Sequence, residues 1–215
     1  MGDSNGKKRP MITFTKYTPY MVSDLENLVD TEGNKLETGQ VVALCRCGKS
    51  KIKPYCDGSH GTDGIDGEKQ EGRKKDKVIS YKGEEITIHD NRGVCSHDGS
   101  CWRCLPTVFK KDMKLRWINP DGDSVKKIVE TIEMCPSGAL SYSIGGTKCQ
   151  DLLREPQIKM AKDGPLEVTG FIGLKDDQGS TPQSKEHYTL CRCGASKNKP
   201  FCDGGHKKAG FSDDD

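Results

Sequence analysis

The sequence predicts an α+β protein, with two small β-rich modules on either side of a different α+β segment. Three observations lead to this prediction. A cysteine-rich motif occurs twice without a gap, at an offset of 146 residues (191 − 45 = 146). Short strand-like runs precede both copies of the motif, and one amphipathic helix pattern lies between the copies. The length of 215 residues is enough for one large domain or two small ones.

The repeat extends well beyond the cysteines. Residues 45–60 match residues 191–206, and the same offset also aligns proline, valine, leucine and glycine residues upstream of the motif. We therefore predict a first module over residues 11–65 and a second module over residues 164–211.

Each module contains two short apolar runs that are typical of strands. In the first module these are residues 20–22 and 41–44, and in the second they are residues 166–168 and 187–190. The later run of each pair leads directly into the cysteine motif. The candidate metal ligands should therefore lie at the end of a small sheet, in modules that have no pattern for a long helix.

The residues between the modules predict a linker followed by a separate domain. Residues 66–77 are rich in Gly, Lys, Glu and Asp, which is typical of a linker. Residues 78–155 form the predicted domain, in which residues 78–81 and 86–88 are strand-like runs around a Lys-Gly turn. After Tyr142 we predict a loop as far as the second module.

The central domain should also contain one helix. Val125, Ile128, Val129 and Ile132 have the spacing of a single apolar helix face. Asp123 or Ser124 can cap this helix at its start, and Pro136 marks its end. The helix then brings Cys135 to its last turn.

Charge and apolar patterning exclude several classes of protein. The chain has 34 Lys and Arg against 32 Asp and Glu, and this net charge of +2 disfavours a nucleic-acid partner. The sequence contains no run of about 18 apolar residues, so we expect no membrane span. Residues 1–10 lack the apolar core of a signal peptide. We therefore expect a cytoplasmic protein, in which eleven cysteines are metal ligands rather than disulfide partners.

The repeated motif supplies three thiolates and one imidazole with the spacing Cys-x-Cys-x8-Cys-x3-His. Its members are Cys45, Cys47, Cys56 and His60 in the first copy and Cys191, Cys193, Cys202 and His206 in the second. This donor set suits zinc or an iron–sulfur cluster. Cys-x-Cys is tighter than the usual pairs of structural zinc, whereas a two-iron cluster can take one pair at each iron. A zinc-stapled fold remains the alternative, and ungapped duplication argues against cysteines that merely fill a core.

The motif resembles the CDGSH iron–sulfur (NEET) family. The residues that carry the resemblance are the run from Cys56 to His60, with Pro54 before it, and the run from Cys202 to His206. Gly205 stands where the family often has Ser, which removes only a local hydrogen bond. The resemblance implies one [2Fe-2S] cluster in each copy, held by the four residues of its motif.

The resemblance also implies how the modules fold. Family members are small β-rich modules that pair, because one module is too small to bury an adequate core. Two copies in one chain can pair at high effective concentration. We therefore expect an intrachain pseudo-dimer with an inserted ferredoxin-like domain, and a monomer in solution.

The ligands and their charged neighbours predict the chemistry of these sites. An imidazole in place of a thiolate raises the reduction potential and makes cluster retention sensitive to pH. Seven basic residues lie within the two motifs, namely Arg46, Lys49, Lys51, Lys53, Arg192, Lys197 and Lys199. They either favour the reduced state or form a solvated face.

A different cysteine pattern lies in the central segment. Cys95 and Cys101 flank a loop, and Cys135 precedes a proline, as in proteins that bind cubane-type clusters. Residues 78–142 resemble single-cluster ferredoxins and the divergent mono-cluster ferredoxin family. This resemblance implies Cys95, Cys101 and Cys135 as ligands of a [3Fe-4S] or [4Fe-4S] cluster.

The fourth position of this cluster is open in the sequence. Asp98 stands where the usual loop has its middle cysteine, so it is the positional candidate for a fourth ligand, and His97 and Cys104 compete with it. The alternatives are a loop-capping Asp98, a surface His97 and a small core Cys104. Cys149 has no motif around it and is expected to be a spare thiol.

These sites together predict an electron-transfer protein that carries three clusters. The sequence contains no nucleophile–base constellation, phosphate loop or dinucleotide fingerprint, so we do not expect an enzyme. The alternatives are cluster storage and transfer, sensing of redox state, iron or pH, and a zinc-stapled binding module. The expected partner is a redox protein or an apo-acceptor protein, with neither nucleic acid nor membrane involved.

Overall fold

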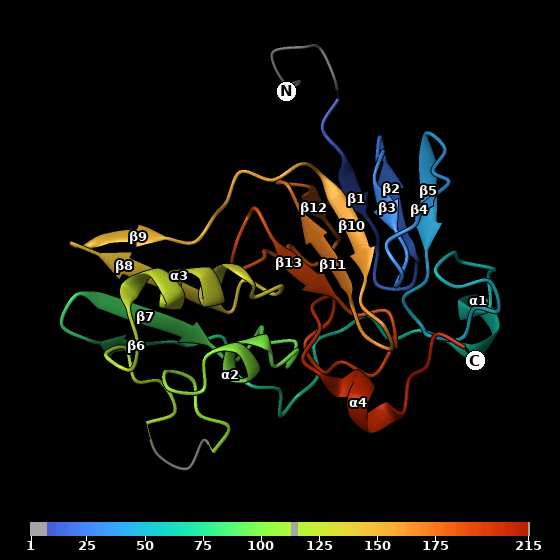
Figure 1. Ribbon diagram of the computed structural model, residues 1–215. Coiled ribbons are helices and arrows are strands. Elements are labelled where there is room, and N and C mark those ends of the chain that lie inside the picture. The colour runs from blue at the N-terminus through green and yellow to red at the C-terminus, as the bar shows by residue number, and fades with distance from the viewer. Residues whose placement is uncertain (1–7, 113–115, 215) are drawn as a thin grey trace.

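The computed structural model describes residues 8–112 and 116–214. Residues 1–7, which belong to the segment where we excluded a signal peptide, lie outside the described residues. Strands dominate the described chain, and its helices are few and short (Figure 1). None of the helices in these ranges has the length and apolar character needed to cross a membrane.

The two copies of the repeat form equivalent strands. The first copy consists of β1 (Met11–Thr13), β2 (Tyr20–Ser23), β3 (Leu28–Val29), β4 (Lys35–Leu36), β5 (Val41–Leu44) and α1 (His60–Asp63). The second consists of β10 (Gln157–Met160), β11 (Leu166–Thr169), β12 (Gly173–Lys175), β13 (Tyr188–Leu190) and α4 (Gly205–Ala209). At the offset of the sequence repeat, β1, β2, β3 and β5 correspond to β10, β11, β12 and β13. The strand-like runs predicted before both motifs are confirmed.

The two copies exchange strands reciprocally. One sheet has the order β12-β1-β2-β5, and β12 of the second copy pairs in parallel with β1 of the first, with Ile12 opposite Leu174. The other sheet has the order β13-β11-β10-β3-β4, and β3 of the first copy pairs in parallel with β10, with Leu28 opposite Ile158. Each sheet is therefore completed by the other copy.

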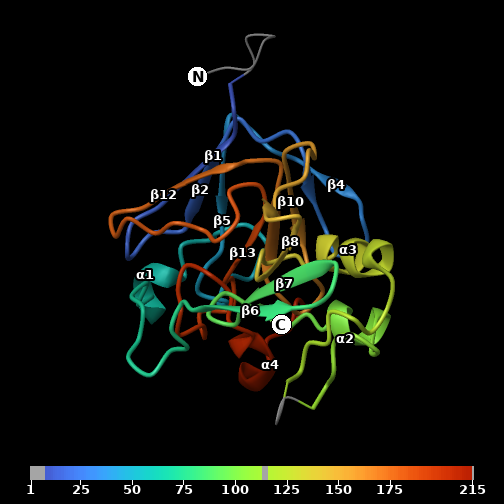
Figure 2. The same cartoon turned by 90° about the vertical axis from the view of Figure 1, so that its left-hand side faces the viewer.

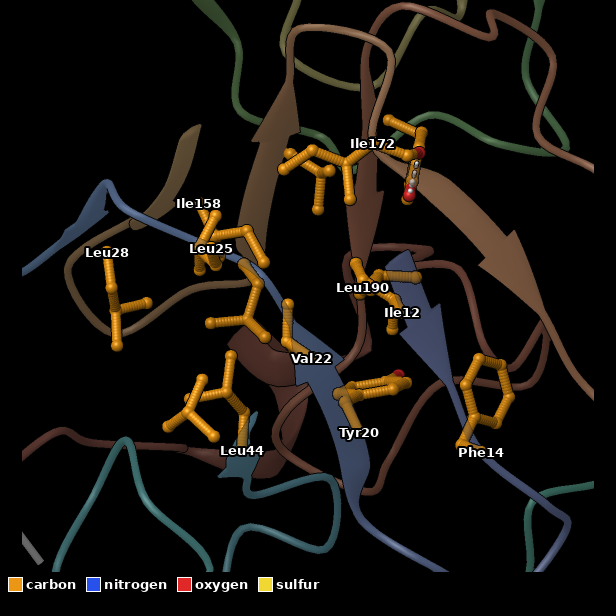
Figure 3. Close-up of a cluster of buried hydrophobic side chains, with 14 of the residues drawn as sticks. Ile12, Phe14, Tyr20, Val22, Leu25, Leu28, Leu44, Ile158, Ile172 and Leu190 are labelled. Carbon is orange, nitrogen blue, oxygen red and sulfur yellow. Dashed lines mark hydrogen bonds between the residues drawn. The ribbon is translucent and has the colours of Figure 1, made fainter. Parts of the chain in front are cut away.

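Both copies contribute to one hydrophobic core. Figure 3 shows Ile12, Val22 and Leu44 from the first copy facing Ile158 and Leu190 from the second, and all five are buried. Alternate residues of each strand point inward, because successive side chains of a strand point to opposite faces. Neither copy has enough apolar residues to form this core alone.

The central segment has its own sheet and core. Strands β6 (Val78–Lys82), β7 (Ile86–Asn91), β8 (Leu140–Ile144) and β9 (Thr147–Cys149) form an antiparallel sheet in that order, accompanied by α2 (Ser100–Cys104) and α3 (Val125–Glu133). Ile128 and Ile132 of α3 are buried in this core, so the predicted helix is confirmed. Ser124 occupies the N-cap position, although its side chain makes no cap hydrogen bond.

The loop predicted after Tyr142 is wrong. Strand β8 continues to Ile144, β9 follows it, and β10 begins at Gln157, before the predicted start of the second module at residue 164. Strand β10 is stabilised on one side by β3, which lies far away in the sequence. On its other side β10 pairs with β11, the next strand along the chain, and the alternation of polar and apolar residues over Gln157–Met160 is the local signal that the prediction overlooked.

The central segment packs against the second copy. Asn91 Nδ2 donates to Gln183 Oε1 at 2.9 Å, and Asn198 Nδ2 donates to the Gly93 oxygen at 2.8 Å. A Cβ on Gly138 would lie 2.9 Å from Ser184 Cβ, so these two backbones pack closely. Figures 1 and 2 place the second copy between the central sheet and the first copy.

Replacing Tyr20 by Phe should destabilise the paired copies. The buried Tyr20 hydroxyl donates to the Cys191 oxygen of the other copy at 2.9 Å. Removing this donor should lower the free energy of unfolding by about 1–3 kcal/mol, since a buried oxygen loses its partner. Chemical denaturation measures the change. Tyr17→Phe is the control, because Tyr17 is 61% exposed, and equal losses in both variants would contradict this role of Tyr20.

Candidate metal centres

The four candidate ligands of the first copy form two pairs. Cys45 Sγ and Cys47 Sγ lie 3.7 Å apart, and Cys56 Sγ lies 3.2 Å from His60 Nδ1. Cys45 follows β5 directly, and its N–H donates to the Pro54 oxygen at 2.8 Å. Cys56 N–H donates to the oxygen of Ala43 in β5 at 2.9 Å. The end of one strand therefore holds both pairs.

The second copy repeats this arrangement. Cys191 Sγ and Cys193 Sγ lie 3.6 Å apart, and Cys202 Sγ lies 3.4 Å from His206 Nδ1. The Cys191 N–H donates to the Pro200 oxygen at 2.8 Å. Both sites therefore lie at the end of a sheet, where the sequence placed them.

These separations suit two ligands of one tetrahedral metal ion. Two thiolates at about 2.3 Å from such an ion lie about 3.8 Å apart. Among the described residues, no group of three or more His, Cys, Asp or Glu side chains has a geometry that could hold one metal ion. The four donors of each copy therefore lie as two close pairs, each of which could hold a metal ion.

Backbone N–H groups point at the sulfur atoms of these sites. Gly58 N–H donates to Cys56 Sγ at 3.4 Å, and Gly204 N–H donates to Cys202 Sγ at the same distance. Similar donors reach Cys47 and Cys193 from Lys49 and Ala195, respectively. Such hydrogen bonds stabilise negative charge on sulfur and tune the potential of a bound cluster.

Proton sharing within each Cys-x-Cys pair favours one thiolate. The Cys47 S–H hydrogen bond lowers the pKa of Cys45 to about 5, and the Cys193 thiol lowers the pKa of Cys191 to about 6 in the same way. Burial instead raises the pKa of Cys202. Full ionisation of the ligand set therefore needs a positive metal to offset the cost of burial.

The two sites differ in their exposure. Cys56 and His60 are partly exposed, whereas Cys202 is 2% exposed and His206 is 6% exposed. The central segment contributes to this cover, because Asp98 lines a cavity together with His206. Burial also lowers the pKa of His206.

The arginine that follows the first cysteine of each motif is buried. Arg46 donates to the Thr15 and Thr18 oxygens at 2.8 and 3.0 Å, and its guanidinium lies 4.5 Å from the Phe14 ring centroid. Arg192 forms an ion pair with Asp213. Both arginines are 3% exposed, so the alternative of a solvated face is wrong for these two residues. They hold the loops that carry the ligands.

The three cysteines of the central motif meet at one cavity. Cys95, Cys101 and Cys135 line this cavity together with Asp98. Burial, and the neighbouring thiols Cys135 and Cys95, raise the pKa of Cys101 to about 12. Cys95 comes from the loop after β7, and Cys101 comes from α2. Cys135 lies just beyond α3, which ends at Glu133, rather than in its last turn as predicted.

Asp98 also fastens the start of α2. Its carboxylate accepts the Ser100 N–H at 2.9 Å and lies 3.6 Å from Arg103 Nη2. The loop-capping alternative is therefore present in the structure, while Asp98 still lines the cavity. Cys104 is exposed and does not line this cavity. Cys149, at the end of β9, does not line it either.

Aromatic residues fill the core of the central segment. Phe109 and Trp117 are buried in this core together with Leu105, and the partly buried Trp102 packs against them. Cys101 and Cys135 pack against the same core.

Sequence reasoning missed several residues that shape the sites. Arg92 Nη1 donates to Cys95 Sγ at 3.5 Å and approaches the buried Asp90 at 3.8 Å. Asp57 and Asp203 accept backbone N–H groups of their own motifs at 2.9 Å. The same aspartate occurs at the same position of both copies, so the repeat could have identified Asp57 and Asp203 as residues that shape the sites. No motif in the sequence around Arg92 could have identified it.

Comparisons with known proteins agree with the motifs. A family described as iron-binding zinc finger CDGSH type matches residues 17–61 and 163–207, and a family described as divergent 4Fe-4S mono-cluster matches residues 81–145. The chain therefore contains two CDGSH-type iron-binding regions and one divergent 4Fe-4S mono-cluster region. Its two CDGSH copies flank a divergent 4Fe-4S mono-cluster domain, and iron–sulfur binding follows from both matches. This confirms the two resemblances found in the sequence.

Curated relatives cover part of the chain. A stretch of 62 residues, 29% of this chain, is 42% identical to the uncharacterized protein YjdI of Escherichia coli strain K12 and covers 80% of that protein. The protein of the same name from Escherichia coli O157:H7 matches to the same extent. No solved structure matches the chain.

The Ser-to-Gly difference between the CDGSH copies has the expected local effect. Ser59 Oγ donates to Asp57 Oδ1 at 2.7 Å in the first copy. Gly205 lacks this hydroxyl, and a Cβ there would lie 3.0 Å from the Ala195 oxygen. The second copy therefore packs more tightly at this position without changing a ligand.

The first CDGSH site should lose iron faster than the second. Its Cys56–His60 pair is partly exposed, whereas the corresponding pair of the second copy is buried. An iron chelator followed by visible circular dichroism should therefore give a several-fold faster loss from the first site. Cys202→Ser and Cys56→Ser identify the signal of each site. Equal rates, or a faster loss from the second site, would contradict the difference in burial.

Proposed function

We propose that this chain is an electron-transfer protein that binds two [2Fe-2S] clusters and one [3Fe-4S] or [4Fe-4S] cluster. The observation that carries the proposal is the pairing of donors in both CDGSH copies, at separations of 3.2–3.7 Å. The three cysteines around the central cavity support a third group. A bound cluster supplies one-electron chemistry, and the chain supplies ligands, hydrogen bonds and cover.

Each CDGSH group is held by the four residues of its motif. Cys45 and Cys47 hold one iron of the first group, and Cys56 and His60 hold the other. Cys191, Cys193, Cys202 and His206 do the same in the second. The neutral imidazole and the N–H donors at sulfur both favour an added electron, so these sites accept electrons more readily than an all-cysteine site.

The CDGSH copies form an intrachain pseudo-dimer, and the chain is a monomer. The reciprocal pairings β1 with β12 and β3 with β10, and the shared core, support this. The central ferredoxin-like domain is inserted between the copies. Analytical ultracentrifugation tests the monomer, and an obligate dimer would contradict it.

We also propose a partner and a cellular compartment for this chain. The chain is not an enzyme, and its partner is another redox protein rather than nucleic acid or a membrane. Its compartment is the reducing cytoplasm, where cysteines serve as metal ligands rather than disulfide partners.

A second candidate function is cluster storage and transfer, or sensing of redox state, iron or pH. The partly exposed Cys56–His60 pair favours it, because a protonatable ligand at the surface can release a cluster to an apo-acceptor. Release of iron only in one oxidation state would favour this function over electron transfer.

Visible spectroscopy with metal analysis tests the proposed function. The purified protein should be red-brown, contain iron and sulfide, and undergo repeated reduction and reoxidation without loss of iron. A colourless protein with three zinc ions would contradict both functions and favour a zinc-stapled binding module. Loss of iron in every redox cycle would contradict electron transfer alone.

Changing Asp98 to Cys should fix a four-iron cluster in the central domain. A carboxylate is a harder and weaker ligand for iron than a thiolate, so the aerobic wild type should hold a three-iron cluster on Cys95, Cys101 and Cys135. Electron paramagnetic resonance distinguishes the two forms.

Asp98→Asn is the matched control, because an Asn side chain can still accept the Ser100 N–H but is a poorer iron ligand. This variant should keep the three-iron form and resist conversion when iron and reductant are added. A stable four-iron cluster in wild type that is lost in Cys104→Ala would show instead that Cys104 is the fourth ligand.

A further inference from the structure

We propose that the second CDGSH site is the middle member of a chain of three redox sites. In this arrangement His97 and Gly204 connect it to the central site, and the paired backbones of Cys47 and Cys193 connect it to the first CDGSH site. The inference rests on the proposed electron-transfer function and adds an order to its sites, in which the two CDGSH copies have unequal roles.

A short path of bonded and packed atoms joins the central site to the second CDGSH site. His97 N–H donates to Cys95 Sγ at 3.4 Å. The His97 side chain packs on Gly204, where an added Cβ would lie 2.9 Å from His97 Cδ2. Gly204 N–H in turn donates to Cys202 Sγ at 3.4 Å. A ligand sulfur of one site therefore reaches a ligand sulfur of the other through two residues.

The surroundings of His97 fix this contact. Lys207 Nζ donates to the His97 oxygen, and Asn198 Nδ2 donates to the Gly93 oxygen at 2.8 Å. The second copy is therefore hydrogen-bonded to the central loop on both sides of Cys95. His97 has a φ of +58°, which a bulky residue rarely adopts. Such a conformation persists only where the surroundings hold it.

The two CDGSH sites are joined more directly. Cys47 and Cys193, one ligand from each site, face each other in an antiparallel backbone bridge. A Cβ on Gly48 would lie 2.9 Å from the Cys193 oxygen, and a Cβ on Gly194 would lie 2.7 Å from the Cys47 oxygen. Both glycines are required for this close approach, because a larger residue would force the two motifs apart.

The first CDGSH site lacks the corresponding contact with the central site. Gly58 occupies the position of Gly204 in the first motif, and both have a positive φ, of 89° and 82°. A Cβ on Gly58 would have no heavy atom within 4 Å, whereas a Cβ on Gly204 would collide with His97. The order central, second CDGSH, first CDGSH follows from this difference between two otherwise equivalent residues.

The transfer along this path moves one electron and nothing else. An electron that leaves the central site enters the second CDGSH site. The central site is thereby oxidised by one electron, and the second CDGSH site is reduced by one electron. No covalent bond forms or breaks, and no proton is transferred. A one-electron photoreductant supplies the electron from outside in the experiment below.

Gly204→Ala and His97→Ala test the path, and Gly146→Ala is the control. Gly204→Ala and His97→Ala disturb the contact from its two sides, and Gly204 is not a candidate ligand. Gly146, in the turn between β8 and β9, is the matched control, because it has the same φ of 82° as Gly204 but an added Cβ would have no heavy atom within 4 Å. A flash of photoreductant should be followed by internal re-equilibration, observed by absorbance and by electron paramagnetic resonance of rapidly frozen samples. We expect both path variants to slow this step by about an order of magnitude, and Gly146→Ala to leave it at the wild-type rate.

A second measurement on the unaltered protein fixes the order of the sites. Pulsed electron paramagnetic resonance of reduced protein should give a shorter separation, and stronger spin coupling, between the central and second CDGSH sites than between the central and first. The opposite order would overturn the inference even if the variants lose iron. Wild-type rates in both path variants with full iron content would overturn it as well. Failure of the proposed function is distinct, because the protein would then not survive cycles of reduction and reoxidation at all.

Discussion

The reciprocal pairing of β1 with β12 and of β3 with β10 holds the two copies of the repeat together and sets the positions of their cysteine motifs. Each copy of the repeat has too few apolar residues for a stable core. Exchange of one strand in each direction completes both sheets and buries a single core between the copies. The same pairing sets the two motifs side by side, so that Cys47 and Cys193 meet in the backbone. Folding and the placement of the metal sites thus have one cause.

The insertion of the central domain breaks the symmetry that the repeat created. The central domain packs on the second copy through Asn91, Gly138 and His97, which covers the Cys202–His206 pair. The corresponding pair of the first copy stays at the surface. Two motifs with almost the same sequence are therefore placed in different surroundings, and the structure assigns the difference to their neighbours rather than to their ligands.

Local sequence signals predicted much of this protein and missed what depends on distant contacts. The repeat and the ligand spacing placed both CDGSH sites, and the helical spacing of Ile128 and Ile132 predicted α3. Strand β10 was missed although Gln157–Met160 alternate polar and apolar residues and pair with the adjacent β11, whereas its other partner β3 lies far away in the sequence. Arg46 and Arg192 look like surface charges in the sequence, yet both are buried by the loops that they hold. No local pattern could indicate that His97 would pack on Gly204.

Mössbauer spectroscopy of protein enriched in iron-57 can decide whether each CDGSH copy holds a two-iron cluster, because it counts iron environments rather than total metal. In the oxidised protein we expect two equal populations of iron from the CDGSH sites, one with two thiolate ligands and one with a thiolate and an imidazole, beside a separate population from the central domain. A single iron environment in each CDGSH copy, or no iron in either copy, would show that the copies do not bind two-iron clusters.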